Sequence, residues 1–229
     1  MYSRRRFITG AGAAGAGLFL GGCAKEAGTK EVTATEDLMR EHGVLRRALF
    51  VYGEAAARLR GVLPSVPPDA LYRTASLFRA FGEEYHEKKL EEAFIFPAVQ
   101  RAGSPAAKYP DILIVQHQRG REITEYILSA TKLGKIAVDG VKPLASALES
   151  LVRMYLPHAA IEDTIVFPAW KQALSAGELD RMNDRFEDIE HEQFGADGFE
   201  DAVRQIADIE ASLGLDDLRQ FTAPPPPSL

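Results

Sequence analysis

Histidine and glutamate side chains recur along the sequence at spacings that could assemble a metal site. Four of the five histidines form two pairs: His42 and His117 are 75 residues apart, and His86 and His158 are 72 apart. Imidazole and carboxylate ligands together suit iron, manganese or zinc. The single cysteine, Cys23, excludes an intramolecular disulfide framework and any cysteine-rich zinc or iron–sulfur site.

Nearly the same eight-residue sequence motif follows each histidine of the second pair. Residues 91–98 read EEAFIFPA and residues 162–169 read EDTIVFPA, so Glu91 and Glu162 are 71 residues apart. We interpret this as a two-helix unit that occurs twice, with one histidine on its first helix and a histidine–glutamate group on its second. Two such hairpins related by a pseudo-twofold axis would bring four histidines and two glutamates to one level of a bundle core. Because a buried carboxylate is costly unless it meets a cation or a donor, the pattern describes a dinuclear metal centre.

Long segments of helical pattern, joined by short loops, must position these residues. No segment shows convincing strand alternation, and Thr33 and Glu36 form a possible capping box ahead of the first helical segment. Short connections between long helices make neighbouring helices antiparallel. We therefore predict an all-α fold, an up-down antiparallel four-helix bundle with an additional C-terminal helix. The expected bundle helices cover residues 35–60, 69–101, 110–133 and 140–174, and the additional helix covers residues 177–213.

The N-terminal residues predict export. Residues 3–8, SRRRFI, resemble the twin-arginine consensus, and the apolar run after them is too short and too rich in glycine for a comfortable membrane span. The run ends in LGGC at residues 20–23, which resembles a lipobox with Cys23 as the lipidated residue. We therefore expect an exported lipoprotein, anchored to a membrane through Cys23 on the periplasmic side of the cell envelope. The predicted organisation is a signal peptide (1–22), a tether (23–34), the bundle (35–174), a C-terminal helical extension (175–222) and a Pro-rich tail (223–229).

Composition narrows the classes of function. The chain has 229 residues, a hydrophobic content of 46% and a net charge of -6, which fits one full-sized globular domain. The acidic balance argues against a nucleic-acid partner, which would need a basic face. The sequence also shows no glycine-rich phosphate loop and no serine–histidine–acid arrangement, so phosphate-loop and hydrolase chemistry are not expected.

The pattern resembles the hemerythrin-like, or HHE cation-binding, family over about residues 35–172. The motifs that carry the resemblance are Arg40-Glu41-His42, His86 with Glu91-Glu92 and Phe96-Pro97, Gln116-His117, and His158 with Glu162-Asp163 and Phe167-Pro168. The resemblance implies a four-helix bundle that holds two iron ions as a non-haem di-iron centre, with zinc or manganese as alternatives. It also implies a protein that binds or senses oxygen, peroxide or nitric oxide, or that handles iron. The implied ligands are the imidazoles of His42, His86, His117 and His158 and the bridging carboxylates of Glu91 and Glu162.

Two departures from the family pattern affect the ligand set. His86 and Glu91 are five residues apart, which on a regular helix places them about 140° apart. Either a π-bulge restores the common face, or Glu87 takes the position equivalent to His158, so Glu87 stays among the candidate metal ligands. Oxygen-carrying hemerythrins have another histidine one turn after the third-helix histidine, where this chain has Arg121. Arginine cannot ligate a metal, so Arg121 is expected to pair with a carboxylate or with an anion near an open coordination position.

The sequence leaves open the position of His191 and the function of the metal centre. His191 on the fifth segment is expected to be exposed, although that segment could instead fold over the bundle end and supply a fifth imidazole. A di-iron enzyme of peroxidase or oxidase type is one rival function. A structural or interaction module whose helices are held together by metal is another.

Overall fold

The computed structural model describes residues 32–61, 66–195 and 197–227. The expected signal peptide, the Cys23 lipidation position and the tether up to residue 31 lie outside the described residues. Within the described ranges the chain is helical and has no strand. No helix of this part of the chain combines the length and the apolar character that a membrane span requires.

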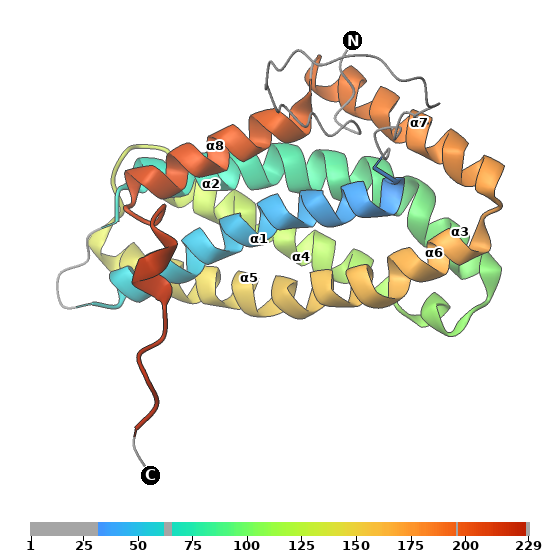
Figure 1. The fold of residues 1–229 in the computed structure, drawn as a ribbon. Helices are drawn as coiled ribbons and strands as arrows, with labels where there is room; N and C mark the ends of the chain where they lie inside the picture. The colour runs from blue at the N-terminus through green and yellow to red at the C-terminus, as the bar shows by residue number, and fades with distance from the viewer. Residues whose placement is uncertain (1–31, 62–65, 196, 228–229) are drawn as a thin grey trace, which may run out of the picture.

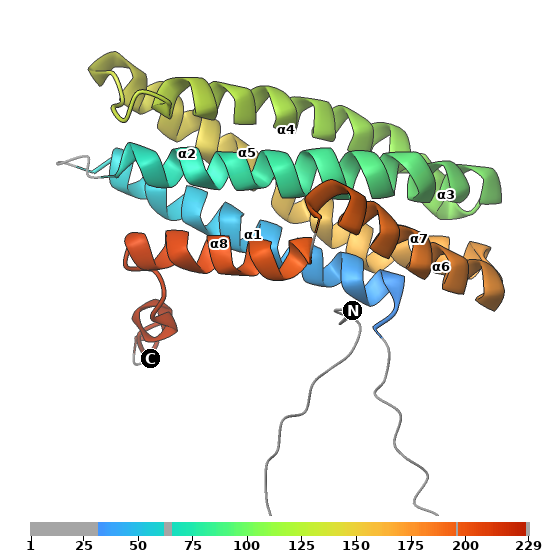
Figure 2. The same ribbon diagram turned by 90° about the horizontal axis from the view of Figure 1, so that it is seen from above.

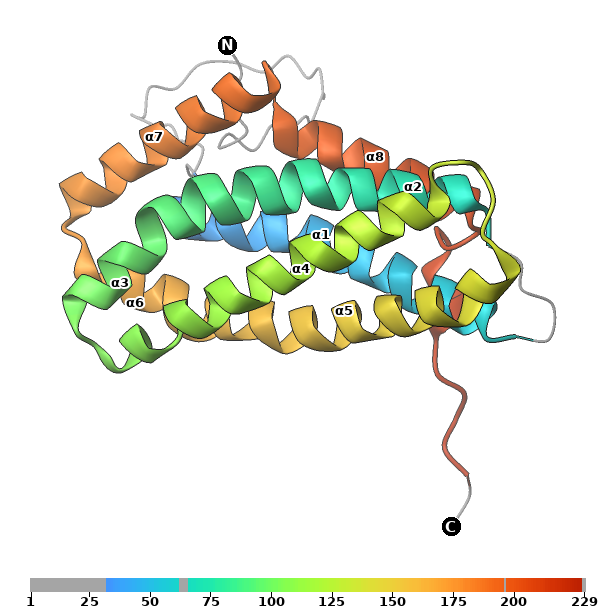
Figure 3. The same ribbon diagram turned by 180° about the vertical axis from the view of Figure 1, so that it is seen from behind.

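Four antiparallel columns of helix form the bundle (Figures 1 and 3). The first and third columns are single helices, whereas the second and fourth each change from α-helix to π-helix and back. The first column is α1 (Ala34–Leu59), the second joins α2 (Pro68–Leu77), η1 (Phe78–Ile95) and α3 (Phe96–Ala102), the third is α4 (Pro110–Thr131), and the fourth joins α5 (Val141–Ile161), η4 (Glu162–Val166) and α6 (Phe167–Ala173). The all-α fold with four up-down bundle helices is thus confirmed.

Local sequence explains where the first helix begins. The Thr33 side chain accepts from the backbone N–H of Glu36, and the Glu36 side chain accepts in return from the backbone N–H of Thr33. This capping box satisfies two N–H groups that a helix start leaves without partners.

Tyr52, Phe78 and Phe81 are buried in the core, which the four columns enclose.

Both π-helical segments end within the repeated sequences, shortly before a proline. The backbone N–H of Phe96 donates to the carbonyl of Glu91, and that of Phe167 donates to the carbonyl of Glu162. Both are bonds to the fifth residue back, the pattern of a π-helix, and Pro97 and Pro168 follow directly. Since proline cannot donate to a carbonyl and clashes with the residue four positions before it, the wider turn accommodates the ring.

The C-terminal extension differs from the single helix predicted over residues 177–213. It forms two helices, α7 (Ala176–Phe194) and α8 (Gly198–Ser212). The break lies at Gly195, whose φ of 69° is the left-handed conformation typical of a glycine after a helix end. The two helices lie outside the bundle, α8 along α1 and α2 and α7 nearer the end that holds α3 and α6 (Figure 2).

Two arginines of α1 hold α8 and its C-terminal end against the bundle. Arg47 of α1 donates to both carboxylate oxygens of Glu210 on α8, at 2.9 and 2.5 Å. Arg58 of the same helix donates to the backbone carbonyl of Leu213 at 3.0 Å. A bidentate arginine–carboxylate pair holds orientation as well as distance, so the extension sits on α1 in a defined register.

Candidate metal centre

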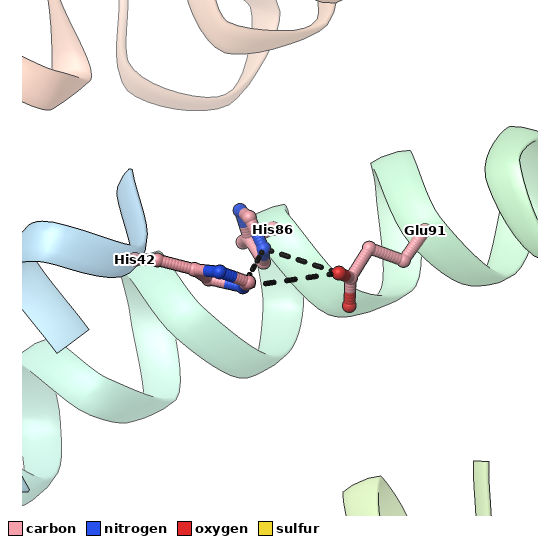
Figure 4. A group of neighbouring side chains, drawn as sticks. All are labelled: His42, His86 and Glu91. Carbon is pink, nitrogen blue, oxygen red and sulfur yellow. Dashed lines mark hydrogen bonds and ion pairs between the residues drawn. The ribbon is translucent and has the colours of Figure 1, made fainter. Parts of the chain in front are cut away.

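One cluster of possible ligand atoms joins α1 and η1. The Nε2 atoms of His42 and His86 are 3.0 Å apart, and Glu91 Oε1 lies 3.3 Å from His86 Nε2 and 4.0 Å from His42 Nε2 (Figure 4). All three side chains are buried. The π-helical backbone of η1 brings His86 and Glu91 to one side despite their five-residue spacing, which is the first of the two alternatives that the sequence left open.

A second cluster joins α4 and the α5–η4 column. The Nε2 atoms of His117 and His158 are 3.1 Å apart, and Glu162 Oε1 lies 3.1 Å from His158 Nε2 and 3.9 Å from His117 Nε2. These three side chains are also buried. Each cluster offers one atom per residue within 4.8 Å of the others, which is close enough for a single ion to reach them all.

The two glutamates connect the clusters. Glu91 Oε1 faces His86, whereas its Oε2 lies 3.4 Å from His117 Nε2 in the other cluster. Glu162 does the same in reverse, with Oε1 toward His158 and Oε2 at 3.6 Å from His42 Nε2. Each cluster therefore has two imidazole nitrogens and one oxygen from each of two carboxylates. These residues could hold two metal ions, with both glutamates contributing an oxygen to each cluster.

The bridging carboxylates fit a pair of cations. All four carboxylate oxygens of Glu91 and Glu162 are buried, and none has a hydrogen-bond partner among the described residues. An unsatisfied buried polar group is costly, and a buried charge more so. Burial raises the pKa of Glu162 to about 8, and burial together with the neighbouring charge of Glu162 raises the pKa of Glu91. Metal ions at the two positions would remove both penalties.

Each histidine is oriented by an oxygen acceptor at its other ring nitrogen. An ionised carboxylate or an amide oxygen has no proton to give, so with these oxygens as acceptors the Nδ1–H donates in each pair and Nε2 is the nitrogen left to face a metal. These acceptors were not predicted as part of the site, although each is next to a predicted ligand in the sequence. The pairs are His42 with Asp163 (2.7 Å), His86 with Glu41 (2.6 Å), His117 with Glu92 (2.9 Å) and His158 with Gln116 (2.8 Å).

Glu87 and Arg121 lie beside the second cluster. Arg121 Nη2 donates to Glu92 Oε1 at 2.6 Å and to Glu87 Oε2 at 3.1 Å. Pairing with a carboxylate is one of the two roles expected for this arginine. The hydroxyl of Tyr155 donates to the other oxygen of Glu87 at 2.7 Å. The ring nitrogen of His117 near Glu87 is Nδ1, at 3.9 Å, and not the Nε2 that faces the cluster. Both Glu87 oxygens thus have protein donors, in contrast to those of Glu91.

His191 is exposed on α7 and belongs to neither cluster, which fits the first of its two readings. A cavity of about 10 Å³, which is room for roughly one water molecule, lies against the ligands and is also lined by Glu87 and Tyr155. A ligand that reaches the centre without rearrangement must therefore be very small.

Comparisons with known proteins agree with this geometry. The hemerythrin HHE cation binding domain, as a family model, matches residues 33–169. Uncharacterized proteins of Mycobacterium tuberculosis and Mycobacterium bovis are 45% identical to the chain over 192 residues, which is 83% of this chain and 74% of each relative. No solved structure matches the chain significantly.

Proposed function

Because the chain belongs to the hemerythrin HHE cation-binding family, we propose that its bundle holds two iron ions and uses them to bind or sense a small ligand. The observation that carries this proposal is the set of four buried carboxylate oxygens of Glu91 and Glu162, which lack hydrogen bonds among the described residues and face four imidazole Nε2 atoms. Mixed nitrogen and oxygen donors without thiolate suit iron better than a softer metal, with zinc and manganese as alternatives.

The protein's own groups would fix the geometry and limit access. The histidines stay aimed at the metal positions because their Nδ1 atoms are held by oxygen acceptors. Iron bound there would supply redox chemistry and an affinity for a small ligand. The small cavity beside the candidate ligands favours very small molecules, and oxygen, peroxide and nitric oxide are the candidates that we propose. Arg121 stands where oxygen carriers have a further histidine, which favours ligand sensing over reversible oxygen carriage.

A peroxidase- or oxidase-like enzyme is the second candidate function. The hydroxyl of Tyr155 and the carboxylate of Glu87 line the cavity beside the metal positions and are bonded to each other at 2.7 Å. Such a pair could hold a proton next to a small oxygen ligand. Turnover of peroxide with an added reductant distinguishes this candidate from a binding protein.

Metal analysis together with a visible spectrum tests the proposed function. Full-length protein isolated anaerobically should contain about two iron ions per chain, since the two clusters offer two equivalent sets of four donor atoms. Exposure to air should change the visible spectrum, because a small oxidant can reach iron through the cavity. Protein that binds one metal ion or none, or a spectrum that air leaves unchanged, would contradict the proposal.

We also propose that the protein works outside the cytoplasm as a lipoprotein anchored at Cys23. What supports this is the pairing of a twin-arginine-like start with a lipobox-like sequence that contains the chain's single cysteine. Lipid anchoring requires more than one acyl chain to be stable, as lipoproteins provide.

The anchor predicts a clear result in cell fractionation. Cys23→Ala should move the exported protein from the membrane fraction to the soluble fraction, because the only acylation site is lost. Replacing Arg4 and Arg5 together by lysine should block export itself and serves as the separate control. A Cys23→Ala protein that stays with the membrane would reject the lipid anchor and leave the metal centre untouched.

A further inference from the structure

The two halves of the metal centre hold their second histidine with different residues. In the first half, Glu41 Oε2 accepts from His86 Nδ1 at 2.6 Å. In the second half, Gln116 Oε1 accepts from His158 Nδ1 at 2.8 Å. Glu41 and Gln116 are 75 residues apart and each directly precedes the first-helix histidine of its repeat, so they are equivalent positions. Their side chains have nearly the same shape and differ in charge.

The first-helix histidines, in contrast, are supported alike. Asp163 accepts from one and Glu92 from the other, and both acceptors are carboxylates. Each carboxylate is also paired with an arginine, Asp163 with Arg46 and Glu92 with Arg121. The acceptors of the four Nδ1 atoms therefore differ in charge at one place, where the first half has Glu41 and the second has Gln116.

An amide supports a metal-binding histidine less well than a carboxylate does. A carboxylate makes a stronger hydrogen bond to the Nδ1–H than an amide does, and this makes Nε2 a better ligand for a cation. An ionised carboxylate can also act only as a hydrogen-bond acceptor. The amide of glutamine can turn its NH₂ group to the ring instead, which satisfies the tautomer whose Nε2 carries the proton and cannot bind metal. Glu41 therefore keeps a proton on Nδ1 of His86 and leaves Nε2 as its metal-facing nitrogen, whereas Gln116 accommodates both tautomers of His158.

We propose that the two metal positions have unequal affinity, with the His42–His86 position the tighter and the His117–His158 position the exchangeable one, and that Gln116 sets this difference. The inference rests on the proposed dinuclear centre and adds an order of loading and loss. One ion would stay bound while the other responds to the metal supply, so the protein would pass through a defined state with a single ion.

Glu87 does not remove the difference between the positions. It lies on the His117 side, but its oxygens accept from Tyr155 at 2.7 Å and from Arg121 at 3.1 Å. It is 3.9 Å from the Nδ1 atom of His117, and that atom already donates to Glu92 at 2.9 Å. Glu87 thus has protein donors of its own and does not act through a hydrogen bond on a ligand histidine.

Anaerobic titration of iron(II) into the metal-free full-length protein, followed by calorimetry, tests the proposal. Wild type should show two separable binding events whose dissociation constants differ by about 10–100-fold, the usual effect of losing such a supporting group. Gln116→Glu should tighten the weaker event by about tenfold or more. Glu41→Gln, the matched control in the other half, should weaken the tighter event and bring the two together. Circular dichroism of each metal-free variant confirms that it is folded.

Diffraction from crystals grown with one equivalent of iron assigns the positions. Anomalous signal should lie between His42 and His86 in wild type, and between His117 and His158 in the double variant Glu41→Gln/Gln116→Glu. Two equal affinities in wild type, or a weaker event that Gln116→Glu leaves unchanged, would overturn the inference while two bound ions still support the proposed function. No iron binding at all would reject both.

Discussion

Replacing Glu162 by alanine should abolish dinuclear metal binding and leave at most one weakly held ion per chain. Glu162 Oε1 lies 3.1 Å from His158 Nε2 and its Oε2 lies 3.6 Å from His42 Nε2, so one substitution removes a donor from both positions and the bridge between them. We expect the affinity for the second ion to fall by more than about 100-fold, beyond what the loss of a supporting group costs. Metal analysis after dialysis against a weak chelator measures the stoichiometry.

Glu84→Ala is the control for that substitution. Glu84 lies on η1 like Glu91, but its carboxylate pairs with Lys88 near the surface at 2.7 Å. Its loss should leave two ions per chain, since a surface pair of this kind contributes little to stability. An unchanged stoichiometry in Glu162→Ala would remove the bridged centre and leave only the family and the fold.

The sequence was informative about this centre because its ligands repeat. Separate histidines and glutamates would mean little, but the intervals between His42 and His117 and between Glu91 and Glu162 require a duplicated hairpin. That duplication predicts both the bundle and the level at which its polar residues meet. The structure places these residues in two adjoining clusters, as the duplication led us to expect.

The features that the sequence could not decide depend on backbone geometry and register. The spacing of His86 and Glu91 fits a π-helix or a ligand at Glu87, and apolar periodicity does not distinguish bonds to the fourth residue from bonds to the fifth. The acceptors of the histidine Nδ1 atoms come from other helices, so which residues fill this role depends on the axial register between neighbouring helices. For Glu41 and Gln116, adjacency to a predicted ligand was the available signal.

The break in the C-terminal extension was predictable in principle. Gly195 is followed two residues later by Asp197, which caps the next helix by accepting from the backbone N–H of Glu200 at 2.9 Å. A glycine followed by an N-cap residue is typical of one helix ending and another beginning. Both α7 and α8 pack one apolar face against the bundle, so the helical periodicity continues before and after Gly195. That continuity led to the prediction of a single helix.

The metal-free and the metal-loaded protein should respond to pH in opposite directions between about pH 6.5 and about pH 8. In the metal-free protein, burial raises the pKa of Glu162 from 4.5 to about 8. The folded state therefore binds more protons than the unfolded state in this range, and the free energy of unfolding falls as the pH rises. Burial lowers the pKa of His42 and of His158 to about 4, so these histidines act in the opposite sense, but only below their unfolded value of 6.5.

Bound metal reverses the slope because it requires deprotonated carboxylates and neutral imidazoles, and so binds more tightly as the pH rises. Since metal held only by the folded state stabilises it, chelation should also lower the melting temperature clearly at every pH in this range. Calorimetric melting of both forms measures the two slopes. Glu162→Gln should make the metal-free slope less steep, because the neutral amide has no proton to lose, while the raised pKa of Glu91 keeps part of the slope. Parallel slopes for the two forms, or a melting temperature that chelation leaves unchanged at confirmed occupancy, would place the metal outside the bundle core.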